Sequence, residues 1–187
     1  MGCTKPRVIQ AGDIADAMEK LCISACCNLP EENLKRIEAF AAAEESEVGR
    51  QVLGMILENH RLAAREQRPA CQDTGLAVVF LELGQDVHIE GGELASAIND
   101  GVRRGYEKGY LRKSVVDDPL FERKNTRDNT PAIIHTTVVA GDKLKITLAA
   151  KGGGAENMSA VAMMIPAAGV EGVRRFVVEQ VRKAGSN

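Results

Sequence analysis

Apolar residues recur at helical spacing through the first third of the chain, with polar residues between them. One helical stretch starts after Asp13, which we expect to be its N-cap; a second starts near Pro30, and a third runs to about Arg65. A helix with one apolar face buries that face against a neighbour. The first third is therefore predicted to be a helical layer with its apolar stripes turned inward.

The pattern changes after residue 75. Residues 76–84, LAVVFLELG, form a short apolar run rich in β-formers, which predicts a buried strand. Residues 91–111 return to helical spacing and contain glycines that permit close packing. Residues 131–154 hold two β-rich runs joined by AGDK, which predicts a hairpin.

The last segment, residues 170–185, is predicted to be a helix that stops at Gly185 and turns four valines inward: Val170, Val173, Val177 and Val181. The order of elements predicts a mixed α/β fold of the α+β class, with a helical layer followed by a small mixed sheet that carries helices. We expect a single domain over residues 1–187, helical over about 1–66 and sheet plus helices over about 67–187.

Composition narrows the possible partners. The 24 basic and 26 acidic residues are mixed along the chain, and there is no Trp, with only two Tyr and four Phe, so neither a nucleic-acid surface nor a stacking platform is expected. Apolar runs fall far short of the roughly 20 residues that a membrane-spanning helix needs. With no signal-peptide pattern and an odd number of cysteines, five, we expect a soluble, cytoplasmic protein with reduced thiols.

Most of the cysteines and histidines are expected to be structural. Cys22, Cys26 and Cys27 match no common zinc or iron-sulfur spacing and lie in a predicted helix, where cysteine packs as a small apolar residue. The three histidines are far apart and share no metal-ligand spacing, so we expect them in structural or surface positions: His60, His88 and His135.

Four polar stretches could carry chemistry, and each also has a purely structural explanation. ACQDTG at 70–75 offers a thiol, an amide and a carboxylate, or a turn with a buried cysteine. KGGG at 151–154 could be an anion-binding nest or a plain turn. Arg112 could hold a carboxylate or only face solvent. NTRDNTPA at 125–132 is explained by turn chemistry.

Taken together and in this order, PACQDTGLAVVF, GYLRKS, NTRDNTPA, KGGGAENMSA and the closing VRKAG resemble the α part of class I fumarases and the related L-tartrate dehydratases. The resemblance is close from about residue 63 onward and looser before it. It implies a hydro-lyase that interconverts fumarate and L-malate, or acts on L-tartrate, with a [4Fe-4S] cluster held by three cysteines and one iron free for substrate.

The resemblance also assigns roles to single residues. Cys71 is implied to be one cluster ligand, and Arg112 to clamp a substrate carboxylate. Gln72 and Asp73 would touch the substrate, with Asp73 the proton-handling residue of this chain or an assistant to a base from the β part. Further donors to a carboxylate would be the amides of Gly152 and Gly153.

The family has two features that this chain lacks. A CPP segment with the next cluster cysteine follows the position where this chain stops at KAGSN, and a third cysteine comes later; Cys3, Cys22, Cys26 and Cys27 match no ligand of the family. We therefore expect a truncated α subunit, or a proteolysed or engineered fragment of one, that is inactive alone. It would need a β subunit and belong to an αβ assembly that dimerises. Two other hypotheses are an anion- or nucleotide-binding module built on KGGG and a purely structural subunit.

Overall fold

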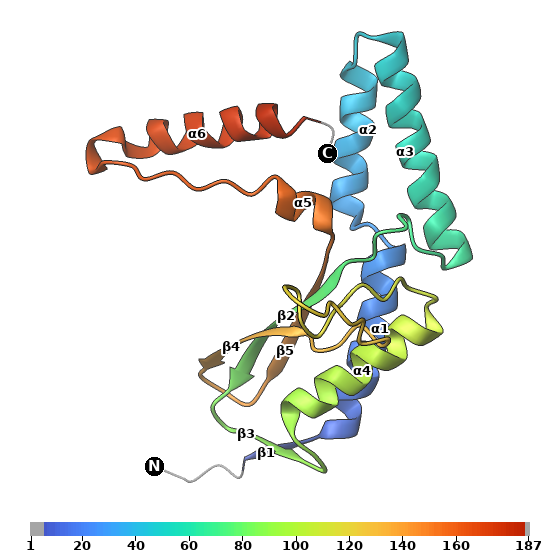
Figure 1. Ribbon diagram of the computed structural model, residues 1–187, viewed down its shortest axis with the longest axis vertical. Helices are drawn as coiled ribbons and strands as arrows, with labels where there is room; N and C mark the ends of the chain where they lie inside the picture. Colours follow the sequence, from blue (N-terminus) through green and yellow to red (C-terminus); the bar gives the residue numbers. More distant parts are fainter. Residues whose placement is uncertain (1–5, 186–187) are drawn as a thin grey trace. The chain divides into compact units, whose positions relative to one another are not determined.

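A computed structural model describes residues 6–185. The chain divides into two compact units, Met1–Lys151 and Gly152–Asn187, and each is described by itself. The observed helices and strands confirm the predicted mixed α+β class. Figure 1 shows the helices and the small sheets that make up the chain.

The three predicted helices of the first third are present. They are α1 (Ala11–Cys27), α2 (Glu31–Ala43) and α3 (Glu47–Glu66). The N-cap of α1 is Gln10 rather than Asp13, which lies in the first turn of the helix instead. The inward stripe is observed for α1, where Ile14 and Met18 are buried, but α2 has no buried residue, so the expectation of a fully inward-facing layer is wrong there.

The central sheet has the order β4-β2-β5. Strand β2 (Leu76–Gly84) is the predicted buried strand, and it pairs in parallel with β4 (Ile133–Val139) and antiparallel with β5 (Leu144–Lys151). The predicted hairpin is therefore wrong, because β2 lies between the two strands that the AGDK link joins. Backbone bonds from the end of β2 to this link, such as Gly84 N–H to the Lys143 carbonyl at 2.8 Å, secure the arrangement.

Two short strands were not expected from the sequence. Strand β1 (Arg7–Gln10) pairs in parallel with β3 (Val87–Glu90) in a separate two-stranded sheet. Helix α4 (Leu94–Lys108) follows, as its apolar spacing predicts, and Glu93 caps its N-terminus by accepting hydrogen bonds from the backbone N–H groups of Ala95 and Ser96.

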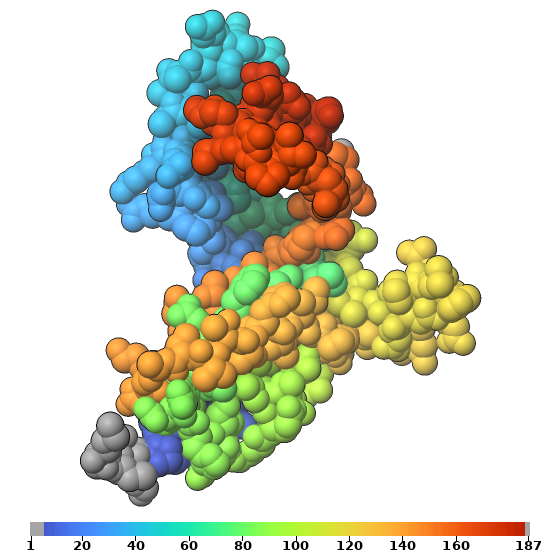
Figure 2. Space-filling model, turned by 90° about the vertical axis from the view of Figure 1, so that its left-hand side faces the viewer, coloured from blue at the N-terminus to red at the C-terminus, as the bar shows by residue number. Residues whose placement is uncertain are grey.

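The core lies between helices α1 and α4 and one face of the central sheet. Alternate residues of β2 point into it, and Val79 and Leu81 are buried against Met18, Ile98 and Val102. On the opposite face of the sheet, Val78 is buried, whereas Phe80 is 48% exposed and its ring stacks on that of His135, with ring centroids 5.2 Å apart. In Figure 2 the green and orange atoms of the sheet strands lie uncovered on the side turned to the viewer.

The second unit contains a short helix α5 (Gly153–Asn157), a 3-10 turn η1 (Pro166–Ala168) and helix α6 (Gly169–Ala184). Helix α6 ends at Gly185 in a left-handed conformation with φ 64°, as the sequence predicts. The inward orientation predicted for its valines is not observed: they are exposed because no described residue of the unit covers them, namely Val170, Val173, Val177 and Val181.

Candidate functional site

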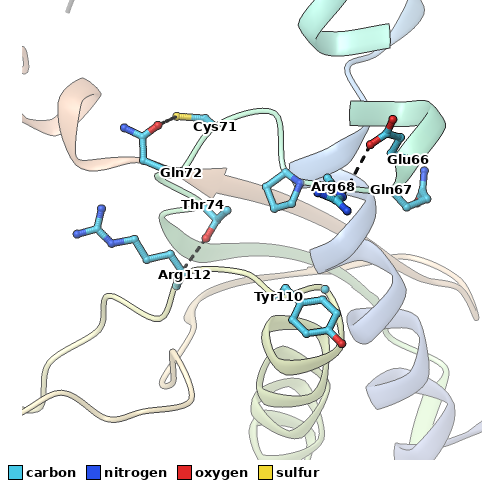
Figure 3. Close-up of a pocket in the computed structure, with 10 residues that line it drawn as sticks. Glu66, Gln67, Arg68, Cys71, Gln72, Thr74, Tyr110 and Arg112 are labelled. Atoms are coloured by element: carbon cyan, nitrogen blue, oxygen red, sulfur yellow. Dashed lines mark hydrogen bonds and ion pairs between the residues drawn. The ribbon is translucent and has the colours of Figure 1, made fainter. Parts of the chain in front are cut away.

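A pocket of about 900 Å³ opens where the end of α3, the turn before β2 and the segment after α4 meet. Figure 3 shows Cys71 and Gln72 on one wall and Arg112 on another, with the ends of the Gln72 and Arg112 side chains reaching toward the same side. The structure thus brings together three of the residues predicted from the sequence. The pocket is lined by Glu66, Gln67, Arg68, Pro69, Cys71, Gln72, Thr74, Gly109, Tyr110 and Arg112.

In the turn at 71–75, Cys71, Gln72 and the buried Thr74 line the pocket, whereas Asp73 is not among its lining residues. Cys71 is exposed, and its sulfur accepts a hydrogen bond from the Asp73 backbone N–H at 3.5 Å. The Gly75 N–H donates to Asp73 Oδ1 at 3.1 Å, and Gly75 adopts a φ of 65°, which glycine tolerates best. The turn predicted as a structural alternative is therefore real, and it holds the cysteine at the surface rather than buried.

Arg112 is fixed through its backbone and free at its charged end. The buried Thr74 hydroxyl donates to the Arg112 carbonyl oxygen at 3.1 Å, and the preceding Leu111 is buried. The guanidinium is exposed at the pocket wall. A fixed backbone with an exposed planar fork suits bidentate recognition of a carboxylate. Arg68 also lines the pocket, where it pairs with Glu66 at 3.8 Å.

Two residues that support the site were missed at the sequence level. Tyr106 is 1% exposed, and its hydroxyl lies 2.9 Å from the Thr74 carbonyl oxygen and 3.1 Å from that of Gly75. Asn129, within NTRDNTPA, is fully buried and bonds to both site segments. The only sequence signal for Tyr106 is its position on the apolar face of α4, which predicts burial but not its partners.

The other described cysteines are packed thiols, as predicted. Cys22 and Cys27 are buried, and burial raises the pKa of Cys22 to about 12. Burial, with a smaller effect of Cys27, raises the pKa of Cys26 to about 11, so Cys26 is a neutral thiol at pH 7. Over residues 6–185 no group of three His, Cys, Asp or Glu side chains could hold a metal ion. Cys71 differs from the packed cysteines, because it is exposed and lines the pocket. Cys3 lies outside the described residues.

Gly152 and Gly153 belong to the second unit. Gly152 is the N-cap of α5 and Gly153 its first residue, so the KGGG stretch does begin a helix directly after β5. Among the described helices, none is long and apolar enough to cross a membrane.

Comparison with known proteins gives consistent matches. The sequence model of the "Fumarate hydratase (Fumerase)" family matches residues 15–187. A Methanocaldococcus jannaschii protein named "Putative L(+)-tartrate dehydratase subunit alpha" is 35% identical over 92% of this chain and 62% of its own length. The L(+)-tartrate dehydratase subunit alpha of Escherichia coli K12 is 28% identical over 85% of this chain and 53% of its own length. The chain thus spans between half and two thirds of these relatives.

Proposed function

Because the chain belongs to the fumarate hydratase family, we propose that it is the α part of a hydro-lyase that adds water to a four-carbon dicarboxylate or removes it. One observation carries the proposal: Cys71, Gln72 and Arg112, which come from two distant segments, line one pocket. The names of the relatives as alpha subunits support a β subunit as partner. We propose in addition that the αβ assembly dimerises, which only the family resemblance implies.

The reaction sets the demands on the site. In the direction of dehydration, a proton leaves a carbon next to a carboxylate while the neighbouring carbon loses hydroxide, and hydration reverses both steps. Arg112 would bind one carboxylate and so orient the carbon skeleton, a gain of positioning. Gln72 would hydrogen-bond the substrate, and the Gly152 and Gly153 amides would bind a carboxylate. Asp73 would accept or return the proton, alone or with a base of the β subunit.

Cys71 would supply one ligand of a [4Fe-4S] cluster. The pocket fits this role, because the Cys71 sulfur is exposed at its wall and is held by the Asp73 backbone N–H at 3.5 Å. Since residues 6–185 contain no three-residue ligand set, the other ligands would come from outside these residues, and we propose that the 187-residue chain is inactive alone. A cluster held in part by Cys71 would supply Lewis acidity for the departure of hydroxide.

Two substrates are candidates. The family description favours fumarate and L-malate, whereas the names of the relatives favour L-tartrate. Assays of the assembled enzyme on fumarate, L-malate and L-tartrate decide between them. Turnover of none of these acids would refute the proposed hydro-lyase, and turnover by the isolated chain would refute its dependence on other parts.

Arg112→Lys tests the carboxylate clamp. Lysine keeps the charge but loses the planar fork, so we expect the KM for the dicarboxylate to rise about tenfold to a hundredfold, which corresponds to the roughly 1.5–3 kcal/mol of a hydrogen bond to a charged group. Arg36→Lys, on exposed helix α2, is the matched control and should leave KM unchanged. An unchanged KM in Arg112→Lys would remove Arg112 from the site.

Cys71→Ser tests the cluster ligand. After anaerobic reconstitution of the assembled enzyme with iron and sulfide, we expect the broad visible absorption of a cluster, and we expect Cys71→Ser to lose it. Cys22→Ser is not a suitable control, because Cys22 is fully packed in the core. Cys26→Ala serves better, since Cys26 is partly exposed, and it should keep the absorption. Equal spectra in all three proteins would exclude Cys71 as a ligand.

A further inference from the structure

Asn129 is a polar residue that lies fully buried in the loop before β4. Its side chain is 0% exposed, and its backbone adopts the left-handed conformation with φ 65°, which asparagine tolerates better than most residues. A fully buried amide is stable only when its polar atoms are bonded. The bonds of Asn129 therefore indicate why this residue stands in the loop.

Both ends of the Asn129 amide bind backbone groups of other segments. Its Oδ1 accepts the N–H groups of Ser114 at 2.7 Å and Val115 at 3.2 Å, and its Nδ2 donates to the Gly75 carbonyl oxygen at 3.1 Å. The orientation of the amide follows from these partners, because two donors face one end and an acceptor faces the other.

These partners flank the pocket residues on both sides. Gly75 ends the turn that carries Cys71, and Ser114 follows Arg112 by two positions. Thr74 makes a second link between the same segments through its bond to the Arg112 carbonyl oxygen. Asn129 thus joins the two walls of the pocket without lining it.

We propose that Asn129 is a positioning residue that sets the spacing between the Cys71 turn and Arg112, and so adapts the pocket to the length of its dicarboxylate. The inference rests on the proposed hydro-lyase function. The two ends of the Asn129 amide hold different walls of the pocket. The Oδ1 atom holds residues 114–115, which follow the substrate-binding Arg112. The Nδ2 atom holds the turn at 71–75, which carries the reacting groups.

Two substitutions separate these ends. Asn129→Gly keeps the left-handed backbone and removes both ends. Asn129→Asp keeps the acceptor for Ser114 and Val115 and, in its ionised form, loses the donor to Gly75. Because a displacement of about 1 Å can cost about a hundredfold in rate, we expect Asn129→Asp to lower kcat by about tenfold to a hundredfold with KM near that of the wild type. Asn129→Gly should lower kcat to a similar degree and also raise KM.

The matched control is Asn99→Ala. Asn99 is another partly buried asparagine that accepts a backbone N–H, that of Ala132 at 2.8 Å, but it supports the start of β4 rather than the pocket walls. We expect this variant to lose stability while kcat and KM of the assembled enzyme stay unchanged. A purely structural role of Asn129 would make its variants behave like this control, with no separation of kcat from KM.

Amide hydrogen exchange on the 187-residue chain tests the linkage without any activity. In Asn129→Gly, peptides that contain residues 71–75 and 112–115 should both exchange at least about tenfold faster, whereas Asn129→Asp should keep the protection of Ser114 and Val115. If the assembled wild type turns over no dicarboxylate, the proposed function is refuted. The amide exchange data then test by themselves whether Asn129 links the two pocket walls. Unchanged exchange in both segments, or kinetics like those of Asn99→Ala, would overturn the inference.

Discussion

Substitution of Gly101 by alanine should destabilise the fold through the contact between helices α1 and α4. A Cβ atom at Gly101 would lie 2.4 Å from the Ala15 carbonyl oxygen and 2.5 Å from Met18 Cβ. The carbonyl belongs to the backbone of α1, so relief requires a shift of the whole helix. Overpacking of this kind costs about 1–3 kcal/mol, and the contact with rigid backbone places Gly101→Ala at the upper end.

The intrinsic helix preference of alanine over glycine opposes this cost by about 1 kcal/mol, which leaves a net loss of about 2 kcal/mol. For a chain of this size, such a loss lowers Tm by about 4–8 °C. Gly54→Ala is the matched control, because Gly54 is also inside a helix and a Cβ there meets nothing within 4 Å. It should gain up to about 1 kcal/mol.

Urea unfolding of the wild type and both variants, followed by circular dichroism, measures the two free energies of unfolding. The expected order of stability is Gly54→Ala above wild type and Gly101→Ala below it. A Gly101→Ala protein as stable as the Gly54→Ala protein would refute the close approach of α1 and α4, and with it the position of the core behind the pocket.

Two further substitutions test the polar groups around α4. Tyr106→Phe removes the buried donor to two carbonyl groups of the site turn and should cost about 1–3 kcal/mol in urea unfolding, whereas the control Tyr110→Phe, at a residue 92% exposed, should change stability by less than about 0.5 kcal/mol. The Ser96 hydroxyl, with the N–H groups of Ser96 and Ala95, lowers the pKa of Glu93. The contribution of the Glu93 carboxylate to the free energy of unfolding is therefore fully present above its unfolded pKa of about 4.3, and it is lost as pH falls through the lower folded pKa. Thermal unfolding of wild type and Glu93→Gln between pH 6 and pH 3 should show a stability difference that shrinks toward acid pH. A difference that stays constant over this range would contradict the capping role.

Local sequence patterns predicted the helices and strand β2 well, because their apolar spacing reflects which face is buried. The partners of the strands could not be predicted in the same way. The link at 140–143 has the composition of a hairpin turn, but β2 separates β4 from β5 through pairings with residues more than fifty positions away in sequence, such as Val78 with Ile133. The valines of α6 show a second limit of local patterns. Their spacing predicts one apolar face of the helix, but it does not predict which segment packs against that face.

The candidate site was predictable only in part. Residue types alone left ACQDTG undecided between a turn and a site, and the resemblance to a family joined it to Arg112; the structure places both on one pocket. Asn129 was explained as turn chemistry, since a polar residue in a polar loop gives no signal of burial. Its function in the fold depends on bonds to Gly75 and Ser114, which no local pattern encodes.

The central position of β2 has a consequence for the order in which the protein forms. Strand β2 leads directly from the turn of Cys71, and Val78 in it pairs with Ile133 on one side and Ala149 on the other. During synthesis, the turn is made long before either neighbouring strand has left the ribosome. Contacts so distant in sequence form late and slowly. The thiol of Cys71 therefore reaches its final surroundings only after residues 133–151 have been made and have paired with β2.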